Sequence, residues 1–498
     1  MVLSKRFQSW YRPCYEQAGA QQGRGCNEQI LAVRLLIDVA RKRKLTLYIA
    51  FVDFQKAYDK VDRYKLLTHL DQHGCGSKFL NALKASYINT TGKIGLSSFI
   101  ADTGVRQGAC SSCPLFTFFV DPIISAIKSS GPDGWLQELH TLLLMDDTII
   151  FATSRRKMEE KLLLLKQSTD SVGMVINSDK SQFLVVGSDD KSPFILDNVT
   201  LAYTESYNYL GTWISNASIS NQVKDHIKMK NRYRLKFTAF LSKNSDAPFS
   251  VKKKVWQSAL LSAIFYSCES WLTKDLKIAE NVYNITLKQM MSVRITTCTD
   301  IVMVESGECG AKSMIRTRQQ NFLQQMMNRE SYKDSYLEWV INMAIHSKCQ
   351  AGLILKELQE SRSQMYATEC ISQWKQAVRT SNSTRRTAYR LLNPTLSVHP
   401  AYSDPHIPEH ERIAFTRIHL SSHDLSFEKG RWSRIAPNDR LCPCGEIQTD
   451  HHVLLQCRLT QAIREEYDIE NVNLNELFTV LVPKTICKYC AKVLIAYD

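Results

Sequence analysis

The 498-residue sequence contains no run of the ~18–20 consecutive apolar residues that a membrane-spanning helix needs. Its first residues, 1–7, lack the apolar core of a secretory signal. Internal repeats and low-complexity tracts are also absent. These absences argue against a membrane protein, a secreted protein and a repeat array. We therefore expect an intracellular protein of the nucleus, the cytoplasm or both, with no membrane partner.

Acidic residues are fewer than basic ones, 49 against 63, which gives a net charge of +14. The surplus is concentrated between residues 224 and 254, where apolar residues interleave with the charges as in helices with one buried face. Such a surface binds nucleic-acid phosphates, although a solvated helix face is the alternative. The residues expected to bind are Lys224, Lys228, Lys230, Arg232, Arg234, Lys236, Lys252, Lys253 and Lys254.

The length predicts about two to four domains, because single hydrophobic cores rarely exceed ~250–300 residues. The 15 cysteines are expected to be reduced thiols and metal ligands of an intracellular protein rather than a disulfide framework.

Three carboxylates stand out because they adjoin apolar runs. Asp53 follows the apolar run that begins at Leu45, which predicts a buried strand. Asp146 and Asp147 lie between two short apolar arms, which predicts a hairpin with these two aspartates as its loop. A solvated acidic turn is one interpretation. Since neighbouring carboxylates repel each other, a site for divalent cations is the other.

Further motifs follow the same order along the chain as those of a known family. They lie at residues 53–63, 104–116, 146–147, 173–180 and 207–211. This set resembles the palm of reverse transcriptases of non-LTR (LINE-like) retrotransposons. The resemblance continues in residues 17–19, 23–30, 266–271 and the C-terminal cysteines, so it spans most of the chain.

The resemblance implies an α+β fold: a right-hand polymerase palm, with an antiparallel sheet packed on helices, partial fingers, a helical thumb and connection, and a small C-terminal zinc knuckle. The implied domains are partial fingers and palm (1–195), a primer-grip hairpin with a basic helical thumb (196–300), a helical connection (301–392), a proline-containing linker (393–430) and a zinc-knuckle tail (431–498).

The resemblance also implies roles for individual residues. The catalytic residues would be Asp53, Asp146, Asp147 and Lys180, with the three aspartates binding two Mg²⁺ ions. Lys180 would donate a proton to pyrophosphate, although a surface lysine is the alternative. The nucleotide-binding residues would be Phe54, Tyr58, Arg106, Gln107 and Gly108, and the primer grip would be Tyr209, Leu210 and Gly211.

Two of these positions need comment. Tyr58 resembles the aromatic residue that excludes a ribose 2′-hydroxyl, and its alternative is a core tyrosine. Met145 departs from the alanine that commonly precedes the aspartate pair, so we expect an effect on rate or fidelity.

The C-terminal tail contains three cysteines and a histidine pair at metal-ligand spacing. The array supplies three thiolates and one imidazole for a structural Zn²⁺ ion, and it resembles the C-terminal knuckle of the same family. The expected ligands are Cys442, Cys444, His452 and Cys457, with buried thiols as the alternative. The neighbouring residues expected to contact nucleic acid are Arg431, Trp432, Arg434 and Arg440.

The resemblance thus implies an RNA-directed DNA polymerase that extends a primer 3′-hydroxyl, with an RNA template, a DNA primer and dNTPs as partners. The family's first finger segment precedes the point where this chain begins. Activity therefore depends on whether Arg6, Arg12 and Arg24 replace its basic residues. One alternative is a catalytically inactive nucleic-acid-binding remnant. Another, a group II intron maturase, is disfavoured by the C-terminal knuckle.

Overall fold

A computed structural model describes residues 2–88, 90–101, 103–106, 108–360, 365–469 and 472–497. The chain forms two compact units, and each is described by itself. Unit 1 comprises residues 1–223, 269–274 and 322–360, and unit 2 comprises residues 224–268, 275–321 and 361–498. Among the described residues, no helix has the length and apolar character needed to cross a membrane.

Unit 1 is built on a six-stranded sheet with the strand order β4-β5-β1-β6-β8-β7. Neighbouring strands are antiparallel except for β6 and β8, which are parallel. This mixed sheet packed on helices confirms the predicted α+β class. The strands are β1 (Leu47–Val52), β4 (Thr141–Leu144), β5 (Asp147–Ala152), β6 (Gln182–Val186), β7 (Phe194–Leu196) and β8 (Val199–Tyr203).

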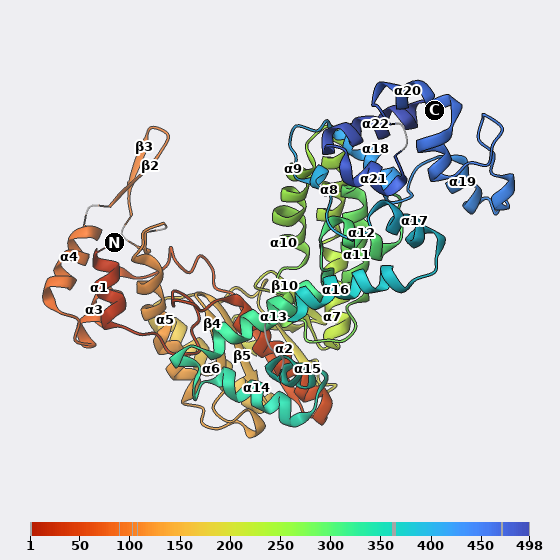
Figure 1. The fold of residues 1–498 in the computed structure, drawn as a ribbon. Helices are drawn as coiled ribbons and strands as arrows, with labels where there is room; N and C mark the ends of the chain where they lie inside the picture. Colours follow the sequence, from red (N-terminus) through yellow and green to blue (C-terminus); the bar gives the residue numbers. More distant parts are fainter. Residues whose placement is uncertain are drawn as a thin grey trace. The chain divides into compact units, whose positions relative to one another are not determined.

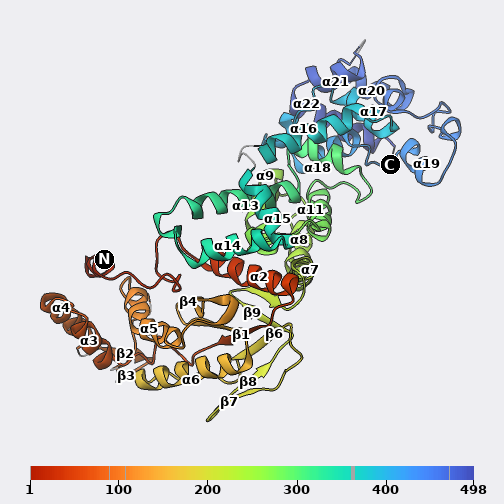
Figure 2. The ribbon, with the colours of Figure 1, turned by 90° about the horizontal axis from the view of Figure 1, so that it is seen from below.

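Strand β1 lies inside the sheet, and all six of its residues are buried. Tyr48, Ala50 and Val52 share one face because strand side chains alternate, and they pack in a core with α5 (Ser112–Lys128) and α6 (Arg155–Val172). Figure 2 shows α2 (Cys26–Arg43) on the opposite face from α6. Because both faces of the sheet are covered, the strand sequence reads as a continuous apolar run.

Two separate hairpins belong to unit 1: β2 (Thr91–Ile94) with β3 (Ser97–Ile100), and β9 (Ser206–Tyr209) with β10 (Thr212–Ser215) (Figure 1). Helices α14 and α15 pack on α2. The other helices of this unit are α1 (Val2–Trp10), α3 (Arg63–Gln72), α4 (Ser77–Tyr87), α14 (Tyr336–Ser347) and α15 (Gln350–Glu360).

The named elements of unit 2 are helices. They include α8 (Asn231–Lys243), α9 (Phe249–Val255), α10 (Ser262–Ile264), α11 (Lys277–Met290), α12 (Thr299–Ser306), α16 (Met365–Thr380), α17 (Thr384–Leu392), α18 (Glu409–His419), α19 (Ser426–Trp432), α20 (Gln461–Glu466), α21 (Leu474–Val480) and α22 (Pro483–Ile495). Two helices, α7 (Ile219–Met229) and α13 (Ala311–Met327), contribute residues to both units.

The segment expected to be a linker, residues 393–430, differs from that expectation. It contains α18 and the start of α19, and α18 packs against α22. Phe415 and Ile418 of α18 are buried in unit 2. The prolines that suggested a linker precede a helix, since Pro408 is the residue before α18. The other domain boundaries remain predictions.

A buried ion pair fastens α6 to the sheet of unit 1. Lys161 Nζ lies 2.6 Å from Asp133 Oδ2, and both side chains are shielded from solvent. Lys161 also donates to the backbone oxygen of Phe151 in β5 at 2.7 Å. The carboxylate accepts a further hydrogen bond from the hydroxyl of Thr153. Helix α6 is therefore tied to the strand that begins with Asp147.

We predict that Lys161→Met lowers the free energy of unfolding by about 3–5 kcal/mol, because it leaves the Asp133 carboxylate buried without a counter-charge. The double variant Asp133→Leu/Lys161→Met should recover part of this loss. Urea unfolding of the full chain measures both, with Lys356→Met of the exposed Lys356–Glu360 pair as control. An equal loss in the single and double variants would contradict the role of the pair.

Candidate functional site

The predicted aspartates meet at one edge of the sheet of unit 1. Val52, the last residue of β1, lies opposite Thr148 of β5. Asp53 follows Val52 and Asp147 precedes Thr148, so the antiparallel register puts both at the same end of neighbouring strands. Asp146 immediately precedes Asp147 in the connecting turn. The sequence motif and the strand register therefore bring all three carboxylates to one edge.

The turn differs by one residue from the predicted loop. Asp147 pairs with Leu144 and is the first residue of β5, so the two turn residues are Met145 and Asp146. Met145 has a φ of +60°, in the left-handed region that favours glycine. The prediction was wrong in this detail because glycine or asparagine, the usual sign of such a turn, is absent.

Burial and the neighbouring charges raise the pKa values of two of the three carboxyl groups. Burial raises the pKa of Asp146, a backbone hydrogen bond opposes this, and the Asp53 carboxylate adds to the rise. Burial followed by the charges of Asp146 and Asp53 raises the pKa of Asp147 to about 6. Lys180 opposes both shifts. The cluster thus has excess negative charge that a cation would neutralise.

Two side chains from the next motif contact Asp53. The amide nitrogen of Asn177 donates to Asp53 Oδ2 at 3.1 Å, and Lys180 Nζ lies 3.7 Å from the same oxygen. Two thirds of the Lys180 side chain is exposed, so it remains accessible from solvent. The three carboxylates offer oxygen atoms as ligands, and oxygen ligands suit Mg²⁺.

Two of the predicted nucleotide-binding residues, Phe54 and Tyr58, lie near this edge. Tyr58 stacks on Phe116 with ring centroids 4.3 Å apart. Burial, then the charges of Cys113 and Asp146, raise its pKa, so the tyrosine lies close to Asp146. Phe54 is buried and forms a β-bridge with Ile176. Arg106 is exposed and donates to Thr90 Oγ1 at 3.1 Å.

The loop that carries Arg106 depends on glycine. Gly108 has a φ of +82° and Gly104 a φ of +81°, and a Cβ on Gly104 would lie 2.9 Å from the backbone oxygen of Asp59. Gln107 lies outside the described residues.

The predicted primer-grip residues form the tight turn of the β9–β10 hairpin. Leu210 and Gly211 both have positive φ, +48° and +78°. Tyr209 is buried, and its hydroxyl donates to Gln29 Oε1 at 2.6 Å. The turn geometry explains why glycine follows leucine here.

Tyr207 lies near the carboxylates, and although it belongs to the 207–211 motif the sequence analysis gave it no role. Its ring stacks on Phe51 of β1 at 4.3 Å. Burial, then Asp53 and Asp147, raise its pKa to about 12. The available signal was strand alternation, since residues 207 and 209 of β9 share one face.

The predicted nucleic-acid-binding residues of 224–254 fall into two groups. Lys252 differs from the prediction, because it is buried and its Nζ lies 2.7 Å from Glu409 Oε1. Lys253 and Lys224 are paired with Glu308 and Asp275 at 2.9 and 3.0 Å. The exposed members are Lys228, Arg232, Lys236 and Lys254, and Lys230 and Arg234 are half-buried.

The predicted metal ligands of the tail converge in unit 2. Cys442 Sγ lies 3.6 Å from Cys457 Sγ, and Cys444 Sγ lies 3.2 Å from His452 Nε2. All four ligand atoms lie within 4.8 Å of one another. Among the residues that the structure describes, this is the one such group of three or more His, Cys, Asp or Glu side chains, so the three aspartates are gathered less tightly. Three thiols and one imidazole fit a closed tetrahedral metal site.

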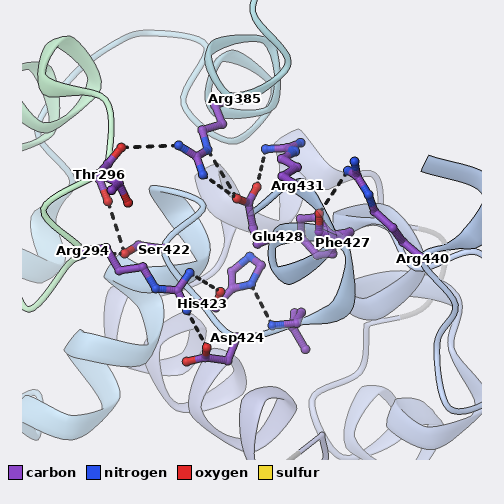
Figure 3. A network of polar contacts seen from close by, with 12 residues as sticks. Arg294, Thr296, Arg385, Ser422, His423, Asp424, Phe427, Glu428, Arg431 and Arg440 are labelled. Atoms are coloured by element: carbon purple, nitrogen blue, oxygen red, sulfur yellow. Dashed lines mark hydrogen bonds and ion pairs between the residues drawn. The ribbon is translucent and has the colours of Figure 1, made fainter. Parts of the chain in front are cut away.

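Arginines that precede this group in the sequence make polar contacts within unit 2, as Figure 3 shows. Arg431 forms an ion pair with the buried Glu428, which Arg385 also contacts at 3.1 Å. Arg440 donates to the backbone oxygens of Phe427 and Ile435 at 3.2 and 3.0 Å. These contacts occupy two of the arginines that were expected to contact nucleic acid.

The aromatic residue of the same set is partly covered. The guanidinium carbon of Arg294 lies 3.6 Å from the centroid of the Trp432 ring, and 44% of Trp432 remains exposed. Arg434 is exposed. Trp432, which is partly exposed, and Arg434, which is exposed, therefore remain accessible from solvent.

Residues 2–214 match the family model described as reverse transcriptase (RNA-dependent DNA polymerase). The chain is also similar to curated proteins of mobile elements. It is 26% identical over 206 residues to the Retrovirus-related Pol polyprotein from type-1 retrotransposable element R2 of Bradysia coprophila, covering 40% of this chain and 24% of the relative. It is 25% identical over 185 residues to the corresponding protein of element R2DM of Drosophila melanogaster, covering 36% and 18%.

A third relative is the Transposon TX1 uncharacterized 149 kDa protein of Xenopus laevis, 24% identical over 182 residues, covering 35% of this chain and 14% of the relative. The chain therefore spans about a quarter or less of the length of these relatives. A solved telomerase from Candida albicans, in complex with a fragment of telomeric RNA, covers 77% of this chain and 56% of that one, with 13% identity. The TM-score between the two structures is 0.34.

The raised pKa of Asp147 predicts a pH-dependent stability of the protein in EDTA. Because its pKa rises from 3.8 to about 6, the folded state binds this proton more tightly than the unfolded state does. The stabilisation is complete below the unfolded pKa and is lost as the pH rises through about 6. Thermal unfolding at a series of pH values between about 4 and 7 measures this loss of stability.

In Asp147→Asn, thermal stability should decrease less as the pH rises. Asp71→Asn, at an exposed position of α3, should show the same decrease as the parent. The same slope in Asp147→Asn and the parent would refute the assignment.

Proposed function

Because residues 2–214 carry a reverse transcriptase domain similar to those of R2 Pol proteins, we propose that this chain is an RNA-directed DNA polymerase of a non-LTR retrotransposon. It extends a primer 3′-hydroxyl with dNTPs on an RNA template and releases pyrophosphate. The observation that carries the proposal is the register of β1 and β5, which sets Asp53 beside Asp147.

In this proposal Asp53, Asp146 and Asp147 hold two Mg²⁺ ions. When bound, two such ions stabilise the attacking and leaving oxygens of an in-line phosphoryl displacement. The backbone of Phe54, next to Asp53, offers a further oxygen ligand. Burial and the charges of neighbouring carboxylates raise the pKa values of Asp146 and Asp147, and this supports the arrangement because a cation would favour their charged forms.

The other residues act on the nucleotide. Tyr58, held by its stacking on Phe116 near Asp146, occupies the volume that a ribose 2′-hydroxyl would need. Lys180, exposed beside Asp53, donates a proton to the leaving pyrophosphate. The residues proposed to contact the nucleotide in addition are Arg106, Gln107 and Gly108.

The template–primer duplex is bound through its phosphates. Tyr209, Leu210 and Gly211 grip the primer strand next to the carboxylates. The exposed basic residues of 224–254 contact the duplex, and the buried Lys252 is left out of this set.

We predict that the purified chain extends an oligonucleotide-primed RNA with dNTPs and Mg²⁺, and that Asp146→Asn lowers the extension rate at least ~100-fold by removing a metal ligand. Asp71→Asn is the matched control and should extend at the parent rate. Gel analysis of extended primers measures the rates.

A second outcome would favour a different function. If neither the parent nor Asp146→Asn extends the primer, but both bind the duplex with affinity that falls steeply with salt, the chain is a catalytically inactive nucleic-acid-binding protein. The exposed basic residues of α8 support binding in either case.

We also propose that Cys442, Cys444, His452 and Cys457 bind one structural Zn²⁺ ion. Burial lowers the pKa of His452, which favours the neutral imidazole that a metal ligand must be. Elemental analysis should find about one zinc per chain and none in Cys442→Ser. The control Cys490→Ala, which alters a buried thiol of α22, should retain the metal. Full retention in Cys442→Ser would refute the ligand set.

A further inference from the structure

The turn that carries Asp146 contains a backbone conformation that its own residue disfavours. Met145 is a non-glycine residue with a φ of +60°. Such a conformation costs of order 1–3 kcal/mol and persists only where the surroundings hold it in place. The position of Asp146 and Asp147 therefore depends on what surrounds Met145.

One buried side chain bonds both backbone polar groups of Met145. The backbone nitrogen of Met145 donates to Gln17 Oε1 at 2.9 Å, and Gln17 Nε2 donates to the Met145 carbonyl oxygen at 3.2 Å. The same Oε1 accepts from the backbone nitrogen of Gly19 at 2.8 Å. Gln17 is fully buried, so water does not compete for these bonds. The amide group of Gln17 clamps the turn from both sides.

The segment around Gln17 lies along the edge strand β4. The Ala18 nitrogen donates to the Leu143 oxygen at 2.9 Å, and the Leu143 nitrogen donates to the Glu16 oxygen at 2.9 Å. A Cβ on Gly19 would lie 2.8 Å from the Met145 nitrogen, so only glycine permits this approach. The clamp is thus fixed by backbone pairing on either side of Gln17.

A second buried glutamine connects this clamp to the β9–β10 hairpin. Gln29 Nε2 donates to the Leu143 oxygen and, at 3.2 Å, to the Glu16 oxygen. Gln29 Oε1 accepts from the Tyr209 hydroxyl at 2.6 Å. Gln29 therefore bonds the primer-grip hairpin both to β4, the strand that leads into the turn, and to the segment that carries Gln17.

We propose that Gln17 and Gln29 are positioning residues for polymerisation. Gln17 fixes the turn and with it the metal-binding geometry of Asp146 and Asp147. Gln29 fixes the position of the primer-grip hairpin relative to β4, the strand that leads into that turn. The inference rests on the proposed function for what the carboxylates do. What it adds is that buried amide side chains, rather than further charged groups, hold the carboxylates in position.

The test measures Mn²⁺ binding, by electron paramagnetic resonance, to the full chain with its zinc site filled. Asp146→Asn should abolish Mn²⁺ binding. Gln17→Ala should weaken Mn²⁺ binding about tenfold, as loss of a group that supports a metal ligand typically does. Gln222→Ala is the matched control, because Gln222 is also a buried glutamine of unit 1 and donates to the backbone oxygens of Ser215 and Ala217. The control should lose stability but keep the parent Mn²⁺ affinity.

A suppressor variant tests the reason for the clamp. Glycine adopts positive φ without a clamp, so Gln17→Ala/Met145→Gly should regain most of the lost affinity and should fold even if Gln17→Ala does not. Tyr209→Phe, which deletes only the hydroxyl that Gln29 holds, should raise the KM for template–primer about threefold at unchanged Mn²⁺ affinity, an effect of order one hydrogen bond.

Three results would overturn the inference. Gln17→Ala could bind Mn²⁺ with the affinity of the parent, or Gln222→Ala could lose as much Mn²⁺ affinity as Gln17→Ala. The third is that Gln17→Ala/Met145→Gly recovers none of the lost affinity. If the parent binds Mn²⁺ as expected but extends no primer, the proposed function fails while the clamp stands. If the parent extends a primer and Gln17→Ala binds Mn²⁺ normally, the clamp fails while the proposed function stands.

Discussion

The antiparallel pairing of β1 with β5 is the constraint on which the candidate site depends. The pairing sets Val52 opposite Thr148, and a slip of one residue would turn every side chain of one strand to the other face of the sheet. Because β1 is buried on both faces, such a slip would force each of its side chains to pack against the helices of the opposite face, so close packing of the core specifies the register. The core of unit 1 thereby places Asp53 beside Asp147 without any direct bond between them.

Charge is distributed differently in the two units. In unit 1, three carboxylates lie together, and Asn177 and Lys180 contact Asp53. Burial, with the charges of neighbouring carboxylates, raises the pKa values of Asp146 and Asp147 although Lys180 opposes both shifts, so the negative charge is only partly compensated. In unit 2, Glu428 and Glu409 are buried with arginine or lysine partners. A site left uncompensated is suited to bind a cation, whereas a fully paired one stabilises the fold.

The sequence predicted the features that follow from hydrophobic pattern and motif order. The strand before Asp53 was apparent because its apolar run is continuous, and the four ligands of the tail because their spacing is characteristic. The turn was misplaced by one residue because Met145 carries no sign of a positive φ; a distant side chain, Gln17, supports it. Tyr207 was missed and Lys252 misassigned because each depends on partners far away in sequence, Phe51 and Glu409. The prolines before α18 suggested a linker because proline ends and begins helices alike.

The division of unit 1 into three sequence segments has a consequence for its biosynthesis. The sheet is complete by residue 203, but α14 and α15, which pack on α2, end only at residue 360. At ~5–20 residues per second, a ribosome needs on the order of ten seconds to add the intervening chain. During that interval the surface of α2 that α14 and α15 cover lacks both helices, so unit 1 reaches its final packing only after its last helix has been made.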